Sequence, residues 1–240
     1  MIPAHVHEEE QRSLTLLCDI QQELANALNS VDGKQSRGAL DNYYFHSADH
    51  VNRDAEGFIF LRKSGRIDAS KLLVRPLIEP MFRVEAIRKK PELFYRIAYS
   101  ETIVEDPKWI GSAASRAGAT FDEAAYSKRF KEFKEQLTNQ LPNVPLEDKY
   151  ISVWEIAEVA GMAGYYGSHY RTYCRYTHGA LWAIGGFLTD LTDPEDNRAM
   201  GLCTWSVLRA LTSIGAESPN WQSLLQRLKE QASHSPFPVK

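Results

Sequence analysis

The chain has 240 residues, 43% hydrophobic and 25% charged, with a formal net charge of −3. This is an ordinary globular composition, and it excludes a protein drawn to nucleic acid or anionic membrane by its overall charge. The three cysteines are far apart and odd in number, which argues against a disulfide framework or a thiolate zinc site. Residues 1–10 contain no signal-peptide-like apolar run and no stretch is long enough to span a bilayer, so we expect a cytoplasmic protein without membrane contact.

Apolar residues recur at three- and four-residue spacing along most of the chain, which predicts helices. The predicted helices, in chain order, cover residues 14–28, 38–63, 68–86, 92–103, 121–141, 153–160, 162–191, 193–215 and 221–232. The helix over 68–86 contains Pro76 and Pro80, which lack a backbone donor, so it should be kinked or split.

Strand signals are missing: the sequence has no run of alternating β-branched residues and no hairpin turn. We also find no internal repeat and no segment with the composition of a domain linker. The sequence therefore predicts an all-α fold, a single-domain multi-helix bundle with long kinked helices. The domain should cover residues 1–240, with a core over about 10–232 and a loose tail over 233–240.

The predicted helix over 162–191 carries the densest group of chemically useful side chains. At about 100° per residue, one face of this helix holds two guanidinium groups, a thiol and an imidazole, from Arg171, Cys174, Arg175 and His178. The opposite face holds aromatic rings, from Tyr165, Tyr166, His169, Tyr173 and Tyr176.

Two interpretations of the polar face remain open. Arginine can bind phosphate through two parallel hydrogen bonds, and histidine can transfer protons near neutral pH, which together suit anion binding and acid–base chemistry. Alternatively, the arginines pair with carboxylates of neighbouring helices and His178 is a core histidine; spacing alone favours this structural interpretation. For the aromatic face we expect packing rather than a platform for stacked bases.

Arg171 and His178, separated by six residues, resemble the Arg-x4–6-His motif of the HEPN superfamily (higher eukaryotes and prokaryotes nucleotide-binding proteins). More closely, the chain resembles a family of uncharacterised, mostly bacterial helical proteins over roughly residues 38–190. That resemblance is carried by Leu73-Val74-Arg75-Pro76-Leu77-Ile78-Glu79 and by Tyr170-x-x-Tyr173-Cys174-x-x-x-His178-Gly179.

The HEPN resemblance implies an endoribonuclease that works as a homodimer and needs neither a metal ion nor a cofactor. His178 would accept the proton of an RNA 2′-hydroxyl, Arg171 would stabilise the phosphate, and Arg175 could bind the backbone. Catalytic HEPN proteins usually place Asn, Asp or His directly after the arginine, where this chain has Thr172. Thr172 and the acidic net charge favour the alternative, a non-catalytic helical module that binds a protein partner or a small ligand.

Arg75 and Glu79 lie one helical turn apart among apolar residues, so we expect both side chains to be partly buried and paired. Either they form an internal ion pair, or Glu79 also orients the helix that carries Arg171, Arg175 and His178. In the second case Arg75 and Glu79, together with Arg175 and Tyr173, would support the proposed catalytic residues Arg171 and His178.

A further polar group lies on the predicted helix over 38–63. His46, His50 and Asp54 follow one another at one-turn intervals, and Asp49 is close to them. With donors from another helix this spacing could bind a transition metal. The di-iron Glu-x-x-His motif is missing from the sequence, so an exposed polar helix face is the better explanation, and we expect no metal site.

Overall fold

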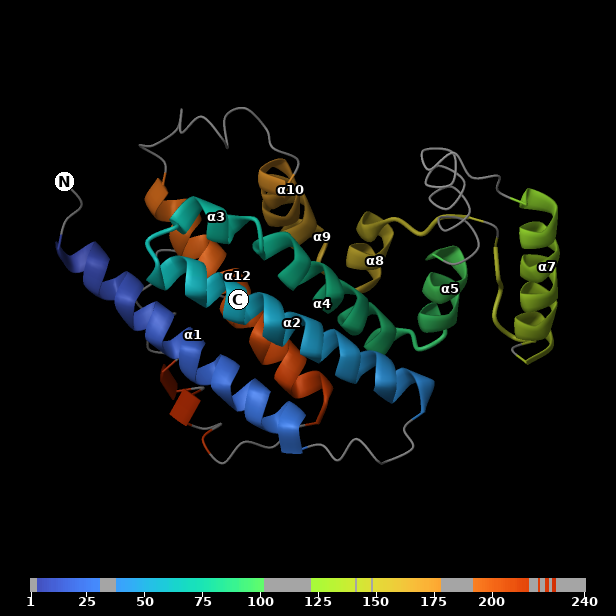
Figure 1. Cartoon of the computed structure of the whole chain (residues 1–240), viewed down its shortest axis with the longest axis horizontal. Coiled ribbons are helices and arrows are strands. Elements are labelled where there is room, and N and C mark those ends of the chain that lie inside the picture. The colour runs from blue at the N-terminus through green and yellow to red at the C-terminus, as the bar shows by residue number, and fades with distance from the viewer. Residues whose placement is uncertain are drawn as a thin grey trace. The chain divides into compact units, whose positions relative to one another are not determined.

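A computed structural model of the chain describes residues 4–30, 38–101, 122–140, 142–147, 149–177, 192–215, 220, 223–224 and 226–227. The regular structure among these residues is entirely helical, so the predicted all-α fold class is confirmed (Figure 1). The helices are α1 (Ala4–Ser30), α2 (Ala39–Lys63), α3 (Ile67–Lys71), α4 (Val74–Lys89), α5 (Leu93–Tyr99), α7 (Glu123–Gln140), α8 (Val153–Val159), α9 (Ala163–Tyr165), the π-helix η2 (Tyr166–Tyr170), α10 (Arg171–Thr177) and α12 (Thr192–Ser213).

Two compact units can be distinguished along the chain. The first combines residues 1–84 with 164–240, and the second covers residues 85–163. The extent of one folding domain over 1–240 stays a prediction. None of the described helices combines the length and the apolar character that crossing a bilayer requires.

Helices α1, α2 and α12 pack against one another and form the core of the first unit (Figure 1). The leucine and isoleucine positions that predicted the first helix are all buried. These are Leu14, Leu17, Ile20, Leu24 and Leu28. Each fully buried side chain of this size contributes about 1.5–3 kcal/mol, so this stripe is a main source of stability for the unit.

The first helix begins earlier than its apolar pattern, at Ala4 rather than near Leu14. A tertiary contact accompanies the extension, because the Nη1 of Arg62 donates to Glu10 over 3.1 Å. The Arg62 side chain is only 1% exposed, so this partner is needed to compensate a buried charge. Local periodicity could not reveal a contact between residues 52 positions apart.

The predicted third helix is split, as its prolines require. Helix α3 ends at Lys71 and α4 begins at Val74, with Leu72 44% exposed at the break. Pro76 falls in the first turn of α4, where a missing N–H costs no helical hydrogen bond, and its ring prevents a continuous helix through Leu72. Pro80 lies inside α4.

The second unit contains α5, α7 and α8, close to the predicted positions of three helices. Helix α8 begins with a capping box that we did not predict: Ser152 accepts from the backbone N–H of Glu155, and Glu155 accepts from the backbone N–H of Ser152. This arrangement satisfies two otherwise unpaired backbone donors and fixes the helix start.

Candidate functional site

The segment that carries the predicted site is helical throughout its described part, but it changes type along its length. It consists of α9, the π-helical turn η2 and α10, which is described as far as Thr177. A π-helical turn accommodates an extra residue and shifts the register of everything that follows, and such turns occur frequently at functional sites. The rest of the predicted helix, residues 178–191, lies outside the described residues.

Tyr170, the last residue of η2, is anchored to α4 by hydrogen bonds at its hydroxyl group. The hydroxyl donates to Glu79 over 2.8 Å and accepts from the Nε of Arg75 over 3.1 Å. Arg75 Nε also lies 3.5 Å from Glu79, and its guanidinium carbon is 5.5 Å from the centre of the Tyr170 ring. Arg75 and Glu79 therefore pair with each other, and both hold the turn that immediately precedes Arg171.

Burial makes this network energetically significant. The side chain of Glu79 is 20% exposed and that of Arg75 is 27% exposed, as expected for a partly buried ion pair. Burial, followed by the charge of Glu79, raises the pKa of Tyr170 well above its usual value, so the phenol remains a hydrogen-bond donor. The ring of Tyr170 is itself buried and packs beside Phe82.

Arg83 is a member of this cluster that sequence analysis missed. Its Nη2 donates to Glu79 over 3.2 Å, so two guanidinium groups and one phenol converge on a single carboxylate. Arg83 follows Glu79 by four residues, which is one helical turn, as Glu79 follows Arg75. This i, i+4 spacing could have identified Arg83 from the sequence. Glu79 is thus the centre of the cluster.

Arg171 is the first residue of α10 and is exposed to solvent. Cys174 is half-buried one turn further along α10, and burial raises the pKa of its thiol although the charge of Arg75 opposes the shift. Thr172 donates its hydroxyl hydrogen bond to the Ser168 carbonyl over 2.8 Å. The side chain of Arg175 and the whole of His178 lie outside the described residues, so the pairing of Arg171 with His178 stays a prediction.

The aromatic residues predicted to share one face divide into two environments. Tyr173 is fully buried and its ring stacks on the buried ring of Tyr176, which confirms the packing interpretation for these two. Tyr165, before the π-helical turn, is 44% exposed and stacks on Trp205 of α12. A single helical register was assumed in the prediction, and η2 breaks it. The buried Tyr173 ring therefore anchors α10 in the core.

Lys71 is a second residue that sequence analysis missed. It is 1% exposed at the end of α3, its Nζ lies 3.0 Å from Asp68, and the ammonium group is 5.5 Å from the centre of the Tyr176 ring. A buried ammonium group over a tyrosine face is held by cation–π attraction as well as by its carboxylate. Lys71 thereby places a positive charge beside the last turn of α10.

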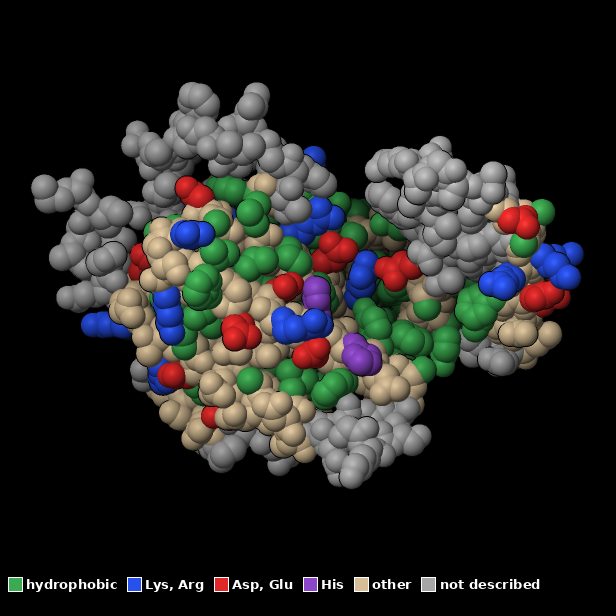
Figure 2. Space-filling model, in the orientation of Figure 1, with side chains coloured by type: hydrophobic (Ala, Val, Ile, Leu, Met, Phe, Trp, Pro, Cys, Tyr) green, Lys and Arg blue, Asp and Glu red, His purple; other side chains and the backbone are tan. Residues whose placement is uncertain are grey.

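The polar cluster on α2 forms pairs among its own side chains. His50 Nε2 lies 3.2 Å from Asp54, and Arg53 lies 3.2 Å from Asp49. Figure 2 shows basic, acidic and histidine side chains mixed on this face of the molecule. Among the described residues no group of three or more His, Cys, Asp or Glu side chains is arranged to hold a metal ion.

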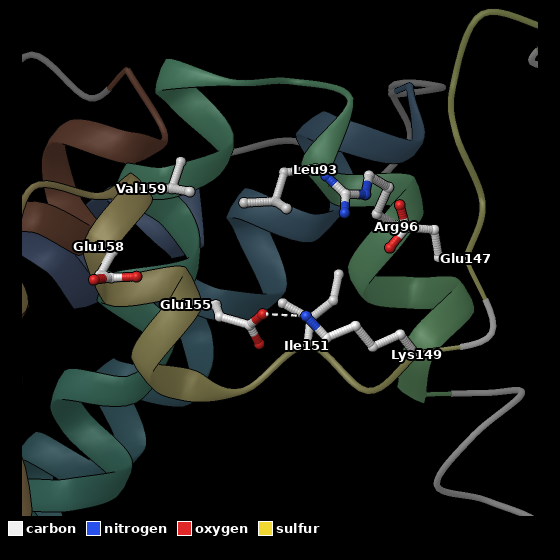
Figure 3. A pocket seen from close by; sticks show the side chains of 8 residues that line it. All are labelled: Leu93, Arg96, Glu147, Lys149, Ile151, Glu155, Glu158 and Val159. Carbon is white, nitrogen blue, oxygen red and sulfur yellow. Dashed lines mark hydrogen bonds and ion pairs between the residues drawn. The ribbon is translucent and has the colours of Figure 1, made fainter.

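The second unit contains a cavity of about 260 Å³ beside α5 and α8. It is lined by Leu93, Arg96, Glu147, Lys149, Ile151, Glu155, Glu158 and Val159. Figure 3 shows Lys149 reaching Glu155, and the two groups are 2.7 Å apart. This ion pair, together with the hydrogen bonds from Ser152, holds the pKa of Glu155 at about 2. Glu155 therefore caps α8 and orders the wall of the cavity.

Residues 42–197 match the model of a family described as a family of unknown function (DUF5677). The match covers most of the segment, roughly 38–190, over which the sequence resembles an uncharacterised helical family. No curated protein and no solved structure matches the chain.

Proposed function

We propose that this chain, which belongs to the family of unknown function DUF5677, binds RNA and cleaves it without a metal ion, with Arg171 as the phosphate-binding residue. The observation that supports this proposal most directly is the position of Arg171. It is exposed, yet the residue before it is fixed by Glu79 and Arg75 at 2.8 Å and 3.1 Å. A guanidinium group on a rigid, well-supported backbone loses little entropy when it binds a phosphate.

In the proposed reaction His178 accepts the proton from the 2′-hydroxyl of the RNA. The 2′-oxygen then attacks the adjacent phosphorus, and the bond to the 5′-oxygen breaks as that oxygen takes a proton from water. Arg171 stabilises the additional negative charge on the five-coordinate phosphate. The products are a 2′,3′-cyclic phosphate and a 5′-hydroxyl, and DNA is not cut because it has no 2′-hydroxyl.

The proposal includes a homodimer. In HEPN-like enzymes two copies of the motif meet across a twofold axis, which would bring a second Arg171 and the two Arg175 side chains to the same phosphate. This concentration of arginines would offset the net charge of −3 at the place where RNA binds.

One observation favours the alternative function, a non-catalytic helical module that binds a protein partner or a small ligand. The Thr172 hydroxyl donates to the Ser168 carbonyl at 2.8 Å, within its own helical segment. The position that usually supplies a catalytic Asn, Asp or His in HEPN enzymes here supports the helix instead. Under this alternative the cluster around Glu79 has a structural role alone.

A cleavage assay separates the two functions. Purified protein is incubated with end-labelled single-stranded RNA, with and without EDTA, and the product ends are identified by mass spectrometry. The proposal predicts 2′,3′-cyclic phosphate ends and equal rates with and without EDTA. Arg171→Lys should lose activity because an ammonium group cannot form two parallel hydrogen bonds to phosphate oxygens. Cleavage that stops with EDTA, or an Arg171→Lys variant as active as wild type, would overturn the assignment.

A further inference from the structure

A partly exposed group of aromatic rings lies at the start of the segment that leads to Arg171; Tyr165 is exposed, and His169 and Trp205 are half-buried. It consists of Tyr165, His169 and Trp205, which we call the aromatic platform. The Tyr165 and Trp205 rings are nearly parallel, with an interplanar angle of 12° and centres 6.4 Å apart. The centre of the His169 ring lies 5.5 Å from that of Tyr165. Rings from two separate helical segments therefore form one surface on the first unit.

The platform retains access to solvent. Tyr165 is 44% exposed, an unusual position for a large aromatic side chain that belongs only to the core. Three glycines lie beside the platform in sequence: Gly164 precedes Tyr165, Gly167 lies within η2, and Gly201 is one turn before Trp205. Among the residues that the structure describes, and apart from each glycine's own helix backbone and chain neighbours, a Cβ atom at each of them would meet no atom within 4 Å.

Two guanidinium groups accompany the rings. Arg209 is exposed, and its guanidinium carbon lies 5.8 Å from the centre of the Trp205 ring. Arg198 is close enough for its charge to help lower the pKa of His169, although burial is the larger cause of that shift. Both causes favour the neutral imidazole over the protonated one, while the arginines beside the rings carry positive charge.

We propose that the aromatic platform binds the bases of single-stranded RNA, with Arg198 and Arg209 contacting the adjacent phosphates. Aromatic faces combined with cationic groups are the arrangement by which proteins bind single strands, because every base has a face that stacks. A double strand keeps its bases stacked on one another and offers no free face. This inference rests on the proposed function for its choice of RNA, and it adds a binding site that precedes Arg171 in the same helical segment.

Binding is tested with a ligand that cannot be cleaved, so that the platform and the cleavage reaction are judged separately. The probe is a short fluorescent 2′-O-methyl oligouridine, and its dissociation constant is measured by anisotropy. Tyr165→Ala should weaken binding about 5- to 150-fold, the loss expected for one stacked base. Tyr165→Phe, which keeps the ring, should bind like wild type. So should Phe60→Ala, the matched control, because Phe60 is an even more exposed aromatic residue on α2.

Two further probes decide whether bases are recognised. An abasic strand with the same backbone should bind as weakly to wild type as the oligouridine binds to Tyr165→Ala. An RNA carrying 5-iodouridine should form photo-crosslinks to peptides that contain Tyr165 or Trp205. The proposal is overturned if Tyr165→Ala binds as tightly as wild type, if the abasic strand binds equally well, or if crosslinks form only elsewhere. If the oligouridine binds through Tyr165 but no RNA is cleaved, the proposed reaction is contradicted and the proposed binding site is still supported.

Discussion

The hydroxyl of Tyr170 donates to the carboxylate of Glu79 over 2.8 Å, joining residues 91 positions apart in the sequence. This bond fixes the π-helical turn η2 against α4 and thereby sets the position of Arg171. Because Glu79 also forms ion pairs with Arg75 and Arg83, one carboxylate compensates two guanidinium groups. The stability of this part of the molecule should depend strongly on that carboxylate.

Glu79→Ala should lower the free energy of unfolding by about 3 kcal/mol, because it removes the carboxylate that pairs with two partly buried guanidinium groups. Tyr170→Phe removes the hydrogen bond to the same carboxylate and the one from Arg75, and should cost about 1.5 kcal/mol. The two losses should not add in the double variant, since both act on one network. Denaturant unfolding measures all three values. A loss of only a few tenths of a kcal/mol for Glu79→Ala would mean that the carboxylate is effectively solvated.

Two glycines should respond to alanine in opposite directions. Gly201 lies on the exposed face of α12 with open space around it, so Gly201→Ala should stabilise the protein by up to about 1 kcal/mol through helix propensity. Gly161 has a φ of +73°, and a Cβ there would lie 2.7 Å from Lys89 Nζ, which donates to the Ala160 carbonyl. Gly161→Ala should destabilise by at least about 1–2 kcal/mol. If the two variants shift the melting temperature in the same direction, the backbone conformation described here for Gly161 or Gly201 is wrong.

Helix α8 should lose its N-terminal support in acid. The pKa of Glu155 is lowered from 4.5 to about 2, first by the hydrogen bond from Lys149 and then by that from the Ser152 backbone. A depressed pKa contributes stability that is complete above pH 4.5 and is lost as the pH falls toward 2. The protection of the α8 amides against hydrogen exchange, relative to the unfolded chain at the same pH, should therefore fall over this interval. Glu155→Ala, which removes the capping side chain, should show the lower protection already at neutral pH and no further fall in this interval.

Cys174 should take no part in the chemistry, although it shares a helix face with Arg171. Burial raises the pKa of its thiol, so the nucleophilic thiolate is scarce at neutral pH. Cys174→Ser should therefore retain the RNA-cleaving activity of wild type. Loss of activity in a variant whose melting temperature and circular dichroism match wild type would instead indicate a thiol-dependent reaction.

Helix positions could be predicted from sequence where the signal was local. Apolar periodicity placed α1, α2 and α12, the prolines at 76 and 80 predicted the split between α3 and α4, and Gly65 and Gly215 end α2 and α12 with positive φ angles. These features depend on a few neighbouring residues, so a single sequence is sufficient to reveal them.

Contacts between segments that are distant in the sequence could not be predicted as readily. The sequence predicts that Glu79 pairs with Arg75 and offers a contact with the helix of Arg171 as the alternative, but it does not identify Tyr170 as the partner there. The π-helical turn shifts the register by one residue, and no local pattern marks such a turn. For the same reason Tyr165 was assigned to the face of Tyr173, whereas it stacks on Trp205, 40 residues away. The geometry of a site built from several helices follows from packing, which one sequence does not specify.

The most direct test of the proposed function is the rate of RNA cleavage by His178→Ala, measured in single turnover beside wild type and with EDTA present. A general base contributes about 10²–10⁴ to the rate, so the variant should lose at least two orders of magnitude while its circular dichroism and melting temperature remain unchanged. It should still bind the uncleavable 2′-O-methyl strand. Wild-type protein that leaves single-stranded RNA uncut, or a folded His178→Ala variant that cuts as fast as wild type, would contradict the assignment and favour the non-catalytic binding module.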